Sequence, residues 1–322
     1  MPAGKLWLEN LTVAKLHRLA IAIGAPCSGT KAARIEGIRR AVTNVARNGG
    51  CGSSDLSLLS IDMGIRNLAF AHITAPLRVT DSAGNFQYGK PRLQAWRRLA
   101  VSELPDVARA VPISVHLDNS REASAAKESF EPVDYATHAY NLINYMLRTY
   151  QPDHVLIERQ RFRSGGGSAV QEWTIRVGVF EGMLYAALRT LIEERKMHLR
   201  VEPMQPSRVN RYWLEDRMHP STRKLAGREV KRAKIELVGD MLQKANPHIC
   251  VGKGMHPFVA DFVSSCNKVS KKKPTATAGM TKLDDLADSL LQGLSWIEWQ
   301  HNRSRIEALG REAIDLDSGA MS

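Results

Sequence analysis

The chain has 322 residues and a formal net charge of +12 at pH 7, from 45 lysines and arginines against 33 aspartates and glutamates. Its length allows one large domain and a small appendage, and the absence of a long apolar run excludes a membrane-spanning helix. The positive excess indicates a polyanionic partner, first of all a nucleic acid, with a basic protein that has no such partner as the plainer alternative.

The N-terminal 50 residues predict a small basic pair of helices. They hold eight lysines and arginines against two glutamates. Thr12 and Thr30 are in position to cap the two helices, and Gly24 is in position to end the first. Such a pair is either a DNA-docking module, with Lys31 among its contacts, or a helical hairpin packed on the main domain. The pattern favours neither over the other.

Residues 51–310 alternate between strands and helices. Apolar runs predict strands over 56–62, 67–74, 92–102, 152–158 and 198–206. Helical periodicity predicts helices over 132–151, 169–195, 207–214 and 228–246, with a last helix from about residue 281. We therefore predict an α/β fold with a mixed five-stranded sheet flanked by helices.

Two acidic residues stand where predicted strands end. Asp62 closes "LLSID", and Glu158 closes "HVLIE". The carboxyl ends of neighbouring strands lie along one edge of a sheet, where open α/β sheets bind their ligands, so we expect these side chains to meet. Taken singly, Asp62 could be a turn residue, and Glu158 could pair with Arg159 or Arg161.

The last predicted helix carries three more acids, Asp284, Asp285 and Asp288, beside an apolar stripe of leucines. Thr281 and Asp284 fit a capping box, and Asp285 would favour the helix dipole, but Asp288 lies beyond the turn where capping helps. At about 100° per residue, Asp284 and Asp288 lie on one edge of the leucine stripe and Asp285 points away from it. We therefore prefer Asp284 and Asp288 for the site and keep Asp285 in reserve.

Carboxylates gathered in one place repel each other unless cations compensate them. Oxygen ligands without a nearby cluster of His or Cys favour Mg²⁺ or Mn²⁺ over Zn²⁺. Two such ions, about 3.5–4 Å apart, form the arrangement that cleaves phosphodiesters. The acids therefore predict a two-metal nuclease site.

The order of these motifs resembles the ribonuclease H-like nuclease superfamily. More narrowly, "LLSIDMGIRNLAFAHI", "VLIERQRFRSGG" and "KLDDLADSLLQGL" resemble the fungal mitochondrial Holliday junction resolvases, which are relatives of bacterial RuvC. The resemblance covers roughly residues 55–300, and residues 11–38 resemble a SAP-type DNA-binding motif. It implies a SAP-like module over 1–50, a nuclease domain over 51–310 and a disordered tail over 311–322.

The resemblance also implies function. It makes Asp62, Glu158, Asp284 and Asp288 metal ligands, although bacterial relatives space their helix pair by three residues, which would select Asp285 instead of Asp284. It implies a mitochondrial homodimer that cuts two opposed strands of a four-way DNA junction, with no membrane partner. Two alternative functions stay open: cleavage of RNA–DNA hybrids by another ribonuclease H-like nuclease, and junction binding without catalysis.

The loop after Glu158 gains a role from this resemblance. Its arginines can hold phosphates near the metals, and its phenylalanine could wedge against unstacked bases or simply be a partly buried aromatic. A lysine-rich segment further on is expected to contact backbone phosphates, or to be only a solvated loop. The predicted DNA-binding residues are Arg159, Arg161, Phe162, Arg163, Lys268, Lys271, Lys272, Lys273 and Lys31.

Overall fold

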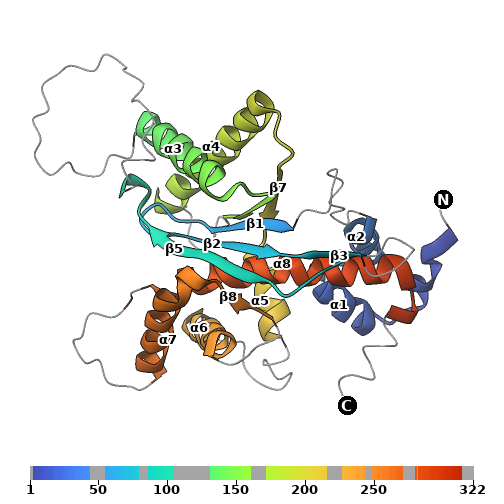
Figure 1. The fold of residues 1–322 in the computed structure, drawn as a ribbon. Coiled ribbons are helices and arrows are strands. Elements are labelled where there is room, and N and C mark those ends of the chain that lie inside the picture. The colour runs from blue at the N-terminus through green and yellow to red at the C-terminus, as the bar shows by residue number, and fades with distance from the viewer. Residues whose placement is uncertain are drawn as a thin grey trace, which may run out of the picture.

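The structure is a computed structural model, and it describes residues 3–43, 55–79, 86–103, 131–160, 172–215, 227–243, 248–270, 280 and 282–313. Within these ranges the chain forms a central twisted sheet with helices on both faces (Figure 1). No helix in the described part of the chain has the length and apolar character needed to cross a membrane.

The sheet has six strands in the order β7-β6-β1-β2-β5-β8. The strands are β1 Leu56–Asp62, β2 Leu68–Ala75, β5 Arg92–Leu99, β6 His154–Glu158, β7 Arg200–Met204 and β8 Cys250–Val251. Strands β1, β2 and β5 form an antiparallel meander, and β6 and β7 continue the sheet in parallel with β1. All five predicted strands are confirmed. The predicted count of five is wrong because β8, a two-residue edge strand parallel to β5, is too short to produce a pattern.

A separate two-stranded hairpin pairs β3 Leu77–Val79 with β4 Phe86–Tyr88. The sequence pattern did not predict it. Its three-residue strands are below the length at which alternation can be recognised.

Both faces of the sheet are covered (Figure 1). Helices α3 Pro132–Tyr150 and α4 Glu172–Arg195 cover one face. Helix α8 Leu283–Leu309 covers the other, backed by α5 Pro206–Leu214, α6 Gly227–Gln243 and α7 His256–Ser270. Strand β1 alternates between the two cores: Leu58 lies in the core on the α8 side and Leu59 in the core on the α3 side. Double burial explains why this strand is apolar throughout.

Helix α8 lies between two layers, and Gln292 and Gly293 are on its sheet-facing side. Gln292 donates hydrogen bonds to Ser60 Oγ and the Ile61 carbonyl of β1, both 3.1 Å. Gly293 lies so close to the sheet that a Cβ there would be 2.7 Å from Ile73 Cδ1. The leucines lie in one core with residues of β1, β2 and β5 and with residues of α6 and α7.

The N-terminal helices α1 Val13–Ala22 and α2 Lys31–Thr43 pack on the C-terminal half of α8 (Figure 1). The predicted caps are confirmed, because Thr12 Oγ1 accepts from the Lys15 amide and Thr30 Oγ1 from the Ala33 amide. The predicted end of the first helix is also confirmed, because α1 ends at Ala22 and Gly24 follows with a positive φ of 66°.

A third small core joins these helices to the end of the chain. Ile306 of α8 and Ala313 are both buried in it, although Ala313 falls inside the tail predicted to be disordered. The N-terminal helices and helix α8 therefore share apolar contacts. The SAP-like character of the module and its boundary at residue 50 stay predictions.

Candidate active site

Asp62 and Glu158 come together at the carboxyl edge of the sheet, as predicted. Their strands β1 and β6 are parallel neighbours with Ser60 opposite Leu156, so the two acids follow in step and project toward α8. The Met63 amide donates to Glu158 Oε2 at 3.4 Å. The tight turn after Asp62 requires Gly64, because a Cβ there would be 2.8 Å from the Asn67 carbonyl oxygen.

The start of α8 brings its aspartates to the same edge. The helix begins at Leu283, with Lys282 at the N-cap in a left-handed conformation and no side-chain capping bond. Asp284 is instead bound by Lys231, so its carboxylate does not act as a cap. Thr281 itself lies outside the described residues.

Asp285 occupies the helical stripe that faces the sheet. It precedes Ser289 by four residues and Gln292 by seven, and Gln292 is bonded to β1. Its Oδ2 is buried without a hydrogen-bond partner among the described residues. Burial and then the charge of Asp284 raise the pKa of Asp285 to about 6.

The pKa of Asp62 is also affected by the other acids at this edge of the sheet. The Asp62 side chain is only 7% exposed. Burial, a hydrogen bond with Glu158 and the charges of Glu158, Asp288 and Asp285 raise the pKa of Asp62 well above its ordinary value.

Two lysines of α6 neutralise the outer aspartates. Lys231 contacts Asp284, and Lys234 contacts Asp288. Burial opposes the charged form of Asp284, but the hydrogen bond and charge of Lys231, a backbone hydrogen bond and the charge of Lys282 together outweigh it and lower the pKa of that carboxyl. Burial raises the pKa of Asp288 even though Lys234 pulls it down.

The donor set fits a hard divalent cation. All of its donor atoms are carboxylate oxygens, and the buried Asp285 oxygen has no partner in the described residues. The raised pKa of Asp62 reflects negative charge that a cation would offset. Among the side chains that the structure describes, no three His, Cys, Asp or Glu residues already stand close enough to hold one ion.

Three further residues support the site and were missed or rated weakly from the sequence. Glu181 of α4 accepts a 3.0 Å hydrogen bond from the Gln160 amide and so holds the segment after Glu158. Its signal in the sequence is a charged residue within the apolar middle of α4, between Val177 and Leu188. The roles of Lys231 and Lys234 have no local signal in the sequence, because their partners are 53 and 54 residues away in the chain.

Most predicted DNA contacts cannot be placed. Arg159 is exposed beside the acids, and its amide donates to the Met204 carbonyl at 2.7 Å. Lys31 donates to the Glu9 carbonyl at 2.7 Å. Lys268 lies in α7, but its side chain is outside the described part, as are Arg161, Phe162, Arg163, Lys271, Lys272 and Lys273.

Comparison with known proteins finds two relatives that are named as cruciform cutting endonucleases. The chain is 24% identical to the cruciform cutting endonuclease 1, mitochondrial, of Saccharomyces cerevisiae, over 94% of this chain and 85% of the relative. The protein of that name from Schizosaccharomyces pombe is 26% identical over 54% of this chain and 60% of the relative.

Among solved structures, the yeast mitochondrial Holliday junction resolvase Ydc2 has the same fold. The match has a TM-score of 0.56 and 20% identity, and it covers 95% of this chain and 99% of the other. A family described as mitochondrial resolvase Ydc2 / RNA splicing MRS1 matches residues 58–306. Because this match covers more than half of the sequence, the chain belongs to the family of the mitochondrial resolvase Ydc2 and the RNA-splicing protein MRS1.

Proposed function

We propose that the protein is a metal-dependent, structure-specific DNA endonuclease that resolves four-way junctions. The observation that carries this proposal is the gathering of Asp62, Glu158, Asp285 and Asp288 where the sheet edge meets the start of α8. The names of the relatives, cruciform cutting endonuclease and Holliday junction resolvase, supply the substrate class.

These four acids are the proposed holders of Mg²⁺ or Mn²⁺. Two such ions, when bound, would activate a water and stabilise the leaving oxygen of a phosphodiester. Asp284 remains the ligand favoured by helical spacing, but its bond to Lys231 and the buried, unpartnered oxygen of Asp285 among the described residues favour Asp285. In this proposal Asp284 orients Lys231 at the rim of the site.

The chain's own cations complete the site. Lys231 is 58% exposed, so it can turn toward a DNA phosphate. Lys234 is 7% exposed and serves to hold Asp288 in place. The exposed Arg159 stands next to Glu158 and can bind the scissile strand by charge-assisted hydrogen bonds. The basic loop that follows it stays the predicted junction-binding segment.

A homodimer would place two such sites on one junction. The face formed by α3 and α4, opposite α8, exposes several large apolar side chains: Val133, Tyr140, Trp173, Ile175 and Val179. A patch of this kind is typical of a protein interface. We infer that this face contributes to the dimer, and that the protein acts in mitochondria as its relatives' names state.

A non-catalytic nucleic-acid-binding protein is the second candidate, because the family description includes an RNA-splicing protein. The acidic residues decide between the two. A binding protein has no need of four carboxylates at one sheet edge, where their repulsion is costly.

The test is cleavage of a labelled four-way junction, a matched linear duplex and an RNA–DNA hybrid, each with and without Mg²⁺. We expect paired, symmetric nicks in the junction only, and only with Mg²⁺. Asp62→Asn should abolish the nicks while junction affinity changes less than about threefold, because the substitution keeps the shape and removes one ligand charge. Asp261→Asn, an exposed aspartate of α7, is the matched control.

Three outcomes contradict the proposal. Cleavage by Asp62→Asn would remove Asp62 from the site. Preferential cutting of the hybrid would support the first alternative, a nuclease of RNA–DNA hybrids. Tight junction binding by the wild-type protein without any cleavage would support the non-catalytic candidate.

A further inference from the structure

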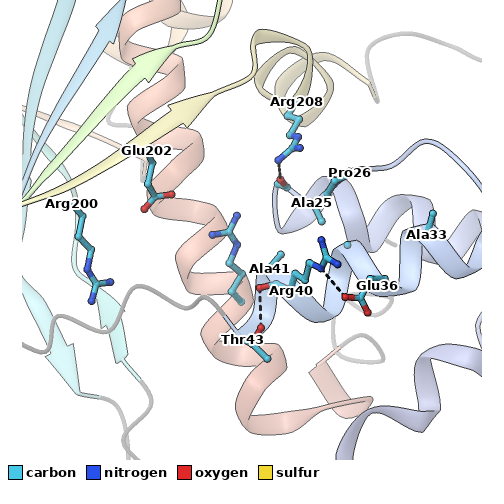
Figure 2. A pocket seen from close by; sticks show the side chains of 13 residues that line it. Ala25, Pro26, Ala33, Glu36, Arg40, Ala41, Thr43, Arg200, Glu202 and Arg208 are labelled. Carbon is cyan, nitrogen blue, oxygen red and sulfur yellow. Dashed lines mark hydrogen bonds and ion pairs between the residues drawn. The ribbon is translucent and has the colours of Figure 1, made fainter. Parts of the chain in front are cut away.

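A cavity of about 910 Å³ lies far from the acids, where the N-terminal helices meet the nuclease domain (Figure 2). Its walls come from α2, the turn after α1, β7, α5 and α8. Among the described residues, its lining includes four arginines and two glutamates: Arg40, Arg200, Arg208, Arg303, Glu36 and Glu202.

The cavity has an excess of positive charge. Arg40 and Glu36 form an ion pair at 2.7 Å, so they offset each other. The other described charged residues of the lining are Arg200, Arg208, Arg303 and Glu202. Burial lowers the pKa of Arg303 to about 10, with Glu202 acting against that shift and Arg208 adding to it. Cationic side chains that lie close together favour the binding of an anion between them.

Backbone contacts hold two of these guanidinium groups in place. Arg303 Nε donates to the Ile23 carbonyl at 2.8 Å, and Arg208 Nη1 donates to the Gly24 carbonyl at 3.1 Å. Both carbonyls belong to the end of α1, where cations also interact well with the helix dipole. Each bond uses one of five N–H donors, and it fixes a planar fork suited to phosphate.

The cavity and the acids lie at opposite edges of the sheet. Arg200 begins β7, whereas Glu158 ends the neighbouring parallel strand β6. Along α8, fifteen residues separate Asp288 from Arg303 (303 − 288), which is about 22 Å at 1.5 Å per residue. Phosphates follow one DNA strand at about 3.4 Å each, so this span corresponds to about six nucleotides.

We propose that this arginine cavity binds a backbone phosphate of a DNA arm, about six nucleotides from the cut. The inference rests on the proposed junction-binding function. It gives the joint between the N-terminal module and the nuclease domain a direct part in holding an arm at a set distance from the acids.

The first test measures junction binding by the cleavage-deficient Asp62→Asn protein at several salt concentrations. Adding Arg200→Gln should weaken binding about tenfold and reduce the slope of log K against log salt by about 0.9, the value for one lost phosphate contact. Arg200 is exposed on β7, so the fold should survive. Arg189→Gln, which removes an equally exposed charge from α4, should change neither quantity.

A methylphosphonate scan locates the contact. Neutralising single phosphates along each arm should weaken the Asp62→Asn protein about tenfold at one position about six nucleotides from the cut. In the protein that also carries Arg200→Gln, the same position should have no further effect. The proposal is overturned if no position near that distance shows this loss, or if Arg189→Gln weakens binding as much as Arg200→Gln.

Inorganic phosphate distinguishes the two sources of the anion. If phosphate raises the melting temperature of the protein more than sulfate or chloride at matched ionic strength, and Arg200→Gln abolishes the effect while the scan is flat, the cavity binds free phosphate instead of DNA. Failure of the proposed function has a different readout, because the wild-type protein would then not cut junctions. The binding experiments would still test the cavity in that case.

Discussion

At the residue scale, alternation along two strands was enough to predict half of the site. Asp62 and Glu158 each end an apolar run, and their shared face follows from the period of two along a strand. The choice among the aspartates of α8 could not be made in the same way. It depends on which side of the helix meets the sheet, and the leucine stripe does not identify that side, because those leucines share one core with the strands and with α6 and α7.

The two candidate aspartates should respond unequally to loss of charge. Asp285→Asn should lower the rate of junction cleavage at least about a hundredfold, because it removes a proposed ligand. Asp284→Asn should cost about tenfold or less, since its main described partner is Lys231. Cleavage rates over a range of Mg²⁺ concentrations measure both. A larger loss for Asp284→Asn would restore the assignment made from helical spacing.

At the element scale, α8 connects the acids, the sheet and the N-terminal module. Periodicity predicted its position in the chain, and apolar runs predicted the five longer strands. The pairing of α6 lysines with α8 aspartates could not be predicted, because it depends on how two helices far apart in sequence pack together. The close approach of α8 to the sheet at Gly293 could not be predicted either, for the same reason.

Gly293 should not tolerate a methyl group. Gly293→Ala would place Cβ 2.7 Å from Ile73 Cδ1 and 3.3 Å from Ser60 Cβ. We expect it to lower the free energy of unfolding by about 2 kcal/mol through overpacking. Gly239→Ala is the matched control in α6, where the nearest atoms of Cys266 are 3.6 Å away. It should be neutral or slightly stabilising, because alanine favours a helix.

Urea unfolding of the three proteins checks this prediction. Gly293→Ala should also reduce cleavage, since a displaced α8 carries its aspartates with it. Equal stability of Gly293→Ala and wild-type protein would show that α8 can shift away from β1 at no cost.

At the scale of the whole molecule, the fold class was predicted correctly, and the resemblance of three separated motifs supplied the topology. The shared core that joins the N-terminal helices to Ile306 and Ala313 was not predicted. Its contacts come from segments almost 300 residues apart. The same long-range packing buries titratable side chains whose burial cannot be predicted from the local sequence. Their burial makes the free energy of unfolding depend on pH.

His154 is one such group, 2% exposed, with its ring centroid 4.7 Å from that of Trp296. Burial lowers the pKa of His154 from 6.5 to about 4. The unfolded chain therefore binds the proton first, so the contribution of His154 to stability is full above pH 6.5 and is lost as pH falls toward 4.

Replacing His154 with leucine should remove this dependence. From pH 7.5 to pH 5, the free energy of unfolding of His154→Leu should rise by about 2 kcal/mol relative to wild-type protein. Denaturant unfolding of both proteins at the two pH values gives the difference directly, and contributions from other titrating groups cancel in it. A difference that does not change with pH would mean that His154 is protonated, or solvated, in the folded protein.

The lysine–aspartate contacts between α6 and α8 have a consequence for how this fold can change. They supply internal counter-ions, so the start of α8 can pack against the sheet without a bound metal. Folding and the nuclease reaction therefore draw on different positive charges. A member of such a family can lose its metal site and keep the scaffold, which accords with a family that includes both a resolvase and a splicing protein.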